Sequence, residues 1–160
     1  PMTDQKPIRV TLEQDGDYAF HISFDDTALG AILTDEPSPL GQDRGPNPVR
    51  LLLASIANCL VASLLFAMRK QHNQPGKLRA EITAIPIRNN EGRWRIPQAH
   101  VELQLPKRDE HYQHLERVLE QFEEFCVVTQ SVRQGIDVQV TVKDAHGRIL
   151  LGDKTFEATS

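Results

Sequence analysis

Residues 51–68 read LLLASIANCLVASLLFAM and contain no charged side chain. Just upstream, Asn47 and Pro48 are typical of a helix start, because asparagine caps free N–H groups and proline suits the first helical position. Downstream, Pro75 ends the pattern. We therefore expect one helix over about residues 48–72, roughly 25 residues or ~37 Å long at 1.5 Å per residue.

The middle of this helix is apolar around nearly its whole circumference, so we expect it to be enclosed on every side. A membrane-spanning helix is the alternative, since the uncharged stretch reaches the lower limit for a span. Ser55, Asn58, Cys59 and Ser63 dilute its hydrophobicity, however, which favours a buried central helix. One chain of 160 residues cannot easily surround such a helix. We therefore expect a homodimer with an extensive apolar interface.

Strand patterns flank the helix on both sides, with apolar and polar residues alternating. A second helix is expected over residues 109–124, with an apolar stripe and an acidic face. The order of strands, long helix, strands, helix and strands predicts an α+β fold with antiparallel hairpins, in a single domain over residues 1–160. The expected strands are residues 8–13, 18–24, 28–33, 77–87, 93–105, 136–142 and 149–156, with a loop over 35–48 and turns at 15–16, 89–92 and 144–147.

Composition excludes several classes of protein. Hydrophobic residues make up 39% and charged residues 25%, which suits a folded core. The net charge is −4, with no basic excess to attract nucleic acid or an anionic membrane surface. Residues 1–6 show neither an apolar targeting segment nor an arginine-rich one, so we expect a cytoplasmic protein whose thiols are kept reduced.

Sequence motifs for nucleotide binding, zinc proteases and serine hydrolases are absent. His111 and His114 are spaced as a helical metal pair, but they lie beside a polar face and are more simply explained as solvated side chains. We therefore expect no metal and no cofactor.

Two cysteines remain as candidates for chemistry. Cys59 lies in the middle of the apolar helix, and Cys126 follows the second helix. Free cysteine often packs as a small hydrophobic residue, so a purely structural role is one interpretation. Glu123 and Glu124 precede Cys126 and are expected to disfavour its thiolate.

Two stretches together resemble the OsmC/Ohr family of osmotically inducible and organic hydroperoxide resistance proteins. The first is GPNP at residues 45–48, followed by LLLAS at 51–55 and by Cys59. The second is EFCVV at 124–128, followed by Gly135 and a strand. The order of elements agrees with the family over nearly the whole chain.

This resemblance implies an intertwined homodimer in which antiparallel sheets wrap two long central helices. It implies that Cys59 attacks an organic hydroperoxide and becomes a sulfenic acid, which Cys126 resolves as a disulfide. It also implies a dithiol reductant, such as a lipoylated protein, that restores the thiols.

The chain departs from the family in the charged groups around the first cysteine. Peroxidase members carry a glutamate after the Asn-Pro pair, where this chain has Val49, and an arginine in the first hairpin turn, where it has Gln14. Arg50 is a poor replacement, because on a regular helix it lies about 180° around from Cys59. Arg44, in the loop, is the candidate that remains.

Two functions follow as hypotheses. The first is a two-cysteine thiol protein that reduces organic hydroperoxides in the response to oxidative stress. The second is a non-catalytic dimer that binds a lipid-like or other small molecule on the same scaffold, with the cysteines as packing residues.

Overall fold

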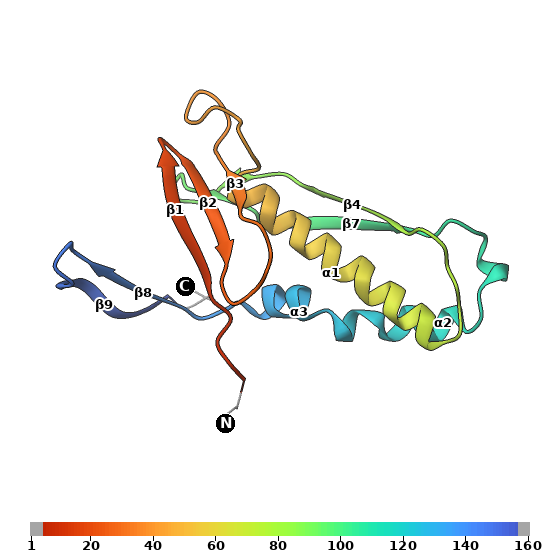
Figure 1. Cartoon of the computed structure of the whole chain (residues 1–160). Helices are drawn as coiled ribbons and strands as arrows, with labels where there is room; N and C mark the ends of the chain where they lie inside the picture. The colour runs from red at the N-terminus through yellow and green to blue at the C-terminus, as the bar shows by residue number, and fades with distance from the viewer. Residues whose placement is uncertain (1–4, 157–160) are drawn as a thin grey trace. The chain divides into compact units, whose positions relative to one another are not determined.

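The computed structural model describes residues 5–156. The chain divides into two compact units, Pro1–Ala54 and Ser55–Ser160, with the boundary inside the long helix α1 (Pro48–Lys70). Figure 1 shows mixed helices and antiparallel hairpins, so the expected α+β class is confirmed. The expectation of one domain over residues 1–160 stays a prediction.

The N-terminal unit holds a three-stranded antiparallel sheet in the order β1 (Val10–Gly16), β2 (Ala19–Phe24) and β3 (Ile32–Thr34). Alternation of apolar residues sets the register, in which Leu12 lies opposite Ile22. The hairpin expected from the sequence is confirmed.

The third strand is shorter than expected, because a turn replaces its first residues. The Thr27 hydroxyl donates to the Phe24 carbonyl at 2.6 Å and accepts from the Leu29 N–H at 3.2 Å. These local bonds compete with strand pairing, as threonine side chains often do. Pairing therefore starts at Ile32.

Helix α1 begins where the sequence indicates. The Asn47 side-chain oxygen accepts from the Arg50 N–H at 3.0 Å, and its carbonyl accepts from the Leu51 N–H at 3.1 Å. At the other end, His72 takes a left-handed conformation with φ 64°, and the Asn73 N–H donates to the Met68 carbonyl at 2.9 Å. This terminating turn stops the helix at Lys70, slightly before the expected end.

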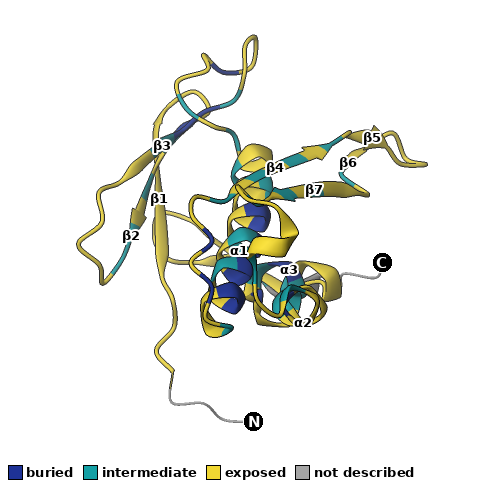
Figure 2. Cartoon of the chain, turned by 90° about the vertical axis from the view of Figure 1, so that its right-hand side faces the viewer, coloured by how far each residue is buried: buried dark blue, intermediate teal, exposed yellow. Residues whose placement is uncertain are grey.

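One face of α1 is buried within the chain, while another is open. The exposed face includes Phe66, which is 55% exposed, and a third of the apolar window of the helix is buried. The single chain therefore leaves one face of the helix open, as its size led us to expect, and enclosure on every side by a homodimer stays a prediction. Figure 2 shows buried stretches of α1 in dark blue. The buried residues of the helix are Ile56, Ala57, Leu60, Ser63, Leu64, Ala67 and Met68.

By length and composition α1 is also the one helix among residues 5–156 that could cross a membrane. The core helix of a soluble protein passes the same test. The buried face of α1 forms two apolar clusters with the C-terminal unit, one around Met68 and Val118 and one around Leu60 and Cys126. This packing is what a buried central helix requires.

The C-terminal unit contains three antiparallel pairs. Strands β4 (Arg79–Ala84) and β7 (Ala99–Gln104) pair with Ile82 opposite Val101, and both residues pack toward the clusters on α1. The remaining pairs are β5 (Ile87–Arg88) with β6 (Trp94–Arg95), and β8 (Val138–Lys143) with β9 (Ile149–Phe156). Pro86 and Pro97 lie between strands, at breaks where a missing N–H costs no ladder bond.

The helix expected over residues 109–124 is wrong as a continuous element. It is divided into η1 (Asp109–His111), α2 (Leu115–Gln121) and η2 (Phe122–Phe125). The break has a physical cause: the Asn73 amide donates to the Gln113 carbonyl at 2.9 Å and accepts from the Gln113 N–H at 2.7 Å. These bonds replace helical ones, and His114 turns to φ 54°.

The apolar stripe of this segment is only partly buried. Tyr112, Leu115, Val118 and Phe122 pack in the cluster around Met68, whereas Leu119 is half exposed. A further helix, α3 (Val127–Gln134), follows directly and was not expected from the sequence.

Candidate functional site

The fold brings together the two cysteines, which are far apart in the sequence. Cys59 lies on α1 between Ile56 and Leu60, and Cys126 lies between η2 and α3. Cys126 belongs to one apolar cluster with Ile56 and Leu60, and Cys59 packs against that cluster. Both cysteines are free thiols.

Cys126 is held by the start of α3. It occupies the N-cap position, and its carbonyl accepts the first helical hydrogen bond, from the Gln130 N–H at 3.0 Å. One turn along, the Thr129 hydroxyl oxygen lies 3.0 Å from the Cys126 sulfur. Cys126 has no exposed surface and Thr129 is 5% exposed, so this contact is shielded from water.

The two thiols are hydrogen-bonded to each other, which couples their titration. Burial raises the pKa of Cys59, and the hydrogen bond and charge of Cys126 raise it further, outweighing the Val128 and Thr129 N–H groups. The Cys59 pKa therefore lies above its ordinary value.

Cys126 is shifted in the opposite direction. Burial alone would raise its pKa, but hydrogen bonds from Cys59, from the hydroxyl and N–H of Thr129, and from Ser63 lower it below its ordinary value. The two pKa values are therefore shifted in opposite directions, and Cys126 is the sulfur with the larger set of donors.

The expectation that Glu123 and Glu124 disfavour a Cys126 thiolate is wrong. The Glu123 carboxylate accepts a hydrogen bond from the Arg133 guanidinium at 2.7 Å, which offsets its charge. The Glu124 side chain is exposed, where water screens it. Because the two glutamates are close to Cys126 in the sequence, their effect on its thiolate was overestimated.

An apolar wall surrounds the sulfur pair, whose two members differ in access. Cys59 is partly exposed, whereas Cys126 is fully buried. Of the two residues, Cys59 is therefore the one open to a small molecule. The wall is formed by Ile82, Val101, Leu103, Phe122 and Val128.

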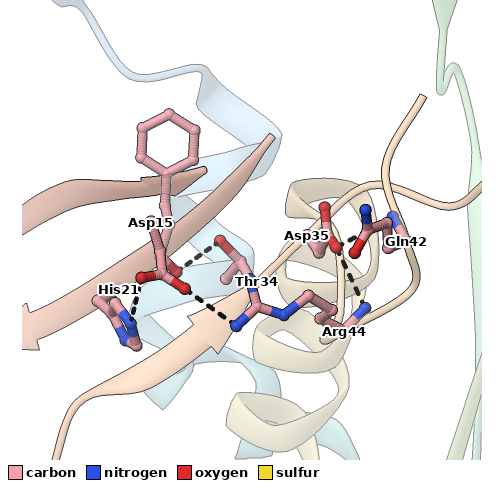
Figure 3. A network of polar contacts seen from close by, with 7 residues as sticks. Asp15, His21, Thr34, Asp35, Gln42 and Arg44 are labelled. Atoms are coloured by element: carbon pink, nitrogen blue, oxygen red, sulfur yellow. Dashed lines mark hydrogen bonds and ion pairs between the residues drawn. The ribbon is translucent and has the colours of Figure 1, made fainter. Parts of the chain in front are cut away.

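Arg44, the third residue expected at the site, lies in the N-terminal unit and is paired there. Its guanidinium donates to the Asp15 carboxylate at 3.0 Å, and the same carboxylate lies 3.4 Å from a nitrogen of His21 (Figure 3). The Arg44 hydrogen bond lowers the pKa of Asp15 below its ordinary value. The role of Arg44 in catalysis stays a prediction.

Gln14 and Val49 are the two positions at which the resemblance implies charged residues, and both are uncharged here. The Gln14 amide donates to the Asp17 carbonyl at 2.8 Å and so closes the hairpin turn. Val49 is 40% exposed in the first turn of α1.

Asp35 shapes the loop that carries Arg44. Its carboxylate accepts the N–H groups of Glu36, Gln42 and Arg44 at 2.8, 3.1 and 3.2 Å, and Figure 3 shows two of these bonds. Gly45 follows where the loop passes β3, and a Cβ there would lie 2.2 Å from the Leu33 carbonyl oxygen. Only glycine fits at this point of the GPNP motif.

A cavity of about 380 Å³ lies in the same unit. Its walls are mainly apolar, with Leu12, Phe20 and Ile22 from the sheet and Leu51 from α1, and Asp35 and Glu36 are at its edge. It is large enough for a small apolar ligand.

Two residues at the cysteine pair were missed by sequence reasoning, Ser63 and Thr129. Both carry a detectable signal: Ser63 is one helical turn after Cys59, and Thr129 has the spacing of a residue that faces an N-cap. No group of three or more His, Cys, Asp or Glu side chains able to hold a metal ion occurs in the described part of the chain.

Comparison with known proteins agrees with this geometry. Residues 41–141 match the family model described as OsmC-like protein. Among solved structures, the OsmC-like protein of Mycoplasma pneumoniae is 18% identical, with 82% of this chain and 89% of that chain covered and a TM-score of 0.62. No curated protein matches the sequence.

Two further solved structures are named as organic hydroperoxide resistance proteins. OsmC of Legionella pneumophila is 14% identical over 82% of this chain and 92% of its own, with a TM-score of 0.62. OhrB of Bacillus subtilis is 20% identical over 80% of this chain and 91% of its own, with a TM-score of 0.59. At these identities the likeness shows a shared fold.

Proposed function

This chain belongs to the OsmC-like family, and we propose that it reduces organic hydroperoxides with Cys59 and Cys126 as its reacting thiols. The observation that carries the proposal is the hydrogen-bonded pair itself: a partly exposed thiol against a fully buried one. A thiol that meets peroxide needs access, and a thiol that resolves a sulfenic acid needs contact with it.

The first step oxidises Cys59. Its sulfur attacks the terminal oxygen of the hydroperoxide, an S–O bond forms, and the O–O bond breaks. The thiol sulfur loses two electrons and becomes a sulfenic acid, while the peroxide leaves as an alcohol after taking up a proton.

The second step uses Cys126. Its thiolate attacks the Cys59 sulfur, an S–S bond forms, and the oxygen leaves as water. The hydrogen bond between the thiols means that the sulfurs already lie close, so little movement is required. An external dithiol, of which a lipoylated protein is one kind, then reduces the disulfide by thiol–disulfide exchange.

The test is treatment of the reduced protein with cumene hydroperoxide, followed by mass spectrometry without reducing agent. We expect each chain to lose two hydrogens and both free thiols. Cys126→Ser is expected to stop at a sulfenic or over-oxidised Cys59, and Cys59→Ser is the matched control in which Cys126 stays reduced. Survival of both thiols in excess hydroperoxide contradicts the proposal.

The binding function remains as the second candidate because of the cavity on the N-terminal sheet. Its apolar lining and volume of about 380 Å³ suit a lipid-like molecule. The two candidates differ in two measurements: a binding protein keeps its thiols in hydroperoxide, and its melting temperature rises with a fatty acid.

The assembly and the compartment belong to the same proposal. A homodimer would cover the open face of α1, where Phe66 is exposed. A cytoplasmic location without membrane attachment is expected, and recovery in the soluble fraction without detergent tests it.

A further inference from the structure

The Cys59 thiol needs a proton acceptor, because only a thiolate attacks a peroxide efficiently. Among the described residues, the pKa of Cys59 is affected mainly by its burial, by Cys126 and by the N–H groups of Val128 and Thr129. None of these is a cation. Among these groups of the described residues, Cys126 is the one titratable side chain.

We propose that Cys126 takes the proton of the Cys59 thiol as Cys59 attacks the hydroperoxide, so that it is a general base in the first step. This inference rests on the proposed function and adds a role to Cys126 beyond resolving the sulfenic acid. Thr129 is the positioning residue that keeps the Cys126 sulfur ready to accept the proton.

The geometry supports Cys126 as the acceptor. The Cys126 thiol donates to the Thr129 hydroxyl oxygen, 3.0 Å away, and this bond reverses when Cys126 is a thiolate, because the hydroxyl then donates to the sulfur. Ser63 donates from α1, one turn beyond Cys59, and Cys59 donates its own S–H. Three hydroxyl or thiol donors thus converge on one buried sulfur, an arrangement that stabilises a thiolate.

Exposure separates the two roles. Cys126 is fully buried and cannot meet a hydroperoxide, whereas Cys59 is partly exposed. The directions of the two pKa shifts agree with these roles, because the Cys126 pKa is lowered and the Cys59 pKa is raised. Burial and the pKa directions therefore both favour Cys126, rather than Cys59, as the sulfur that accepts the proton.

The proton and electron balance is complete without a further reagent. The Cys59 sulfur gives two electrons to the peroxide, its proton moves to the Cys126 sulfur, and the alkoxide takes a proton from water. In the second step Cys126 loses that proton, attacks the sulfenic sulfur and releases hydroxide, which leaves as water. Because Cys126 enters as a thiolate, the sum is one disulfide, one alcohol and one hydroxide per hydroperoxide, and the hydroxide becomes water on taking up a proton from solvent.

Other charged groups on the packed elements face away from the pair. Glu81 on β4 and Glu102 on β7 are exposed and alternate with the inward-facing Ile82 and Val101. Glu123 is paired with Arg133. The pH dependence of the first step is therefore expected to report the cysteine pair.

The test measures the first step alone. Reduced wild type, Cys126→Ala and Cys126→Ser are mixed with tert-butyl hydroperoxide between pH 5.5 and 9, and quenched samples are scored for oxidised Cys59 by intact mass. We expect both variants to be at least about tenfold slower at pH 7, with a rate that rises toward the ordinary thiol pKa of about 8.5 or above.

The outcomes separate the two proposals. If Cys126→Ala oxidises at the wild-type rate with the wild-type pH profile, Cys126 only resolves, and the general-base role is overturned while the proposed function stands. If Cys59 of the wild type is not oxidised, the proposed function itself fails.

A second variant pair keeps both thiols. Thr129→Val removes the hydroxyl with little change in shape and is expected to move the pH midpoint of the first step upward, whereas Thr129→Ser restores it. A purely structural role would lower the melting temperature without moving that midpoint. An unchanged midpoint in Thr129→Val overturns the proposal, even if the Cys126 variants fail to fold.

Discussion

The Asp15 carboxylate and the Arg44 guanidinium form an ion pair at 3.0 Å between the first hairpin and the loop before α1. Peroxidase relatives, by resemblance, carry an arginine in that hairpin and a glutamate after the Asn-Pro pair. This chain has the signs exchanged, with the carboxylate in the hairpin and the arginine in the loop. The Asp15–Arg44 pair therefore uses other positions than the pair that the resemblance implies, because Gln14 and Val49 occupy those.

The first prediction concerns Arg44. If it orients the hydroperoxide and stabilises the leaving oxygen, Arg44→Ala slows oxidation of Cys59 by about 10²-fold, the size of one such contact. Stopped-flow oxidation by tert-butyl hydroperoxide measures the rate. Arg69→Ala, an exposed arginine on α1, is the matched control and is expected to leave the rate unchanged.

The same argument predicts that wild-type turnover is slower than in relatives that keep both charges. Lowering a thiol pKa gains thiolate but loses nucleophilicity, so thiolate enrichment alone is nearly neutral. The missing contact between a cation and the leaving oxygen has the larger effect on the rate. Gln14→Arg combined with Val49→Glu is expected to speed oxidation. Fast wild-type oxidation that Arg44→Ala leaves untouched would show this account of Arg44 to be wrong.

The second prediction concerns Asp35 and pH. Burial alone would raise its pKa, but the N–H groups of Gln42, Arg44 and Glu36 outweigh burial and lower it. A carboxylate with a lower pKa in the folded state stabilises above its unfolded pKa of about 3.9 and loses that stabilisation as the pH falls through its folded pKa. Asp35→Asn is expected to lose stability at pH 7 and to flatten this acid dependence.

Urea unfolding at pH 7 and at several values below pH 4 measures the effect. Asp43→Asn, in the same loop, is the control, because among the described residues its carboxylate accepts one long bond, from the Ser38 N–H at 3.4 Å. Equal acid sensitivity in Asp35→Asn and wild type contradicts the assignment.

Much of the fold could be predicted from local patterns. The start of α1, the first hairpin, the turn at residues 89–92 and strand β9 follow from capping, alternation and glycine turns, all of which depend on neighbouring residues. The break at residues 109–124 could not be predicted in this way. It is caused by the Asn73 side chain, whose bonds to Gln113 join segments that are distant in the sequence.

The candidate site shows the same division. Resemblance identified Cys59 and Cys126, but the direction of their pKa shifts depends on Thr129 and Ser63, which only the fold brings to the sulfurs. The sequence suggested that Glu123 acts on Cys126, because adjacency along the chain hides the ion pair with Arg133. Tertiary partners, absent from a linear pattern, decided both outcomes.

The third prediction tests the core beneath the site. Met68 has no exposed surface and packs with Leu64 and Val118. Met68→Ala is expected to lower the free energy of unfolding by about 2–5 kcal/mol, because it leaves a cavity. Gln74→Ala, at an exposed position nearby, should change it by no more than about 0.5 kcal/mol. Denaturant unfolding at one fixed protein concentration makes the comparison, and a Met68→Ala change as small as the control contradicts it.

The last prediction is the homodimer, which follows from the uncovered face of α1. Asn58, Ala62 and Phe66 are exposed there in the single chain and recur at helical spacing, with the small Ala62 allowing close approach of another helix. Phe66 also contacts Phe125, with the ring planes tilted by 59° and the ring centroids 5.9 Å apart, which widens the apolar surface. Burying a large aromatic side chain of this kind stabilises association by about 1.5–3 kcal/mol. Size-exclusion chromatography with light scattering should therefore give twice the chain mass of 18.1 kDa. Phe66→Glu should shift the protein toward the monomer while Gln74→Glu does not, and a wild type that is monomeric at micromolar concentration refutes the assembly.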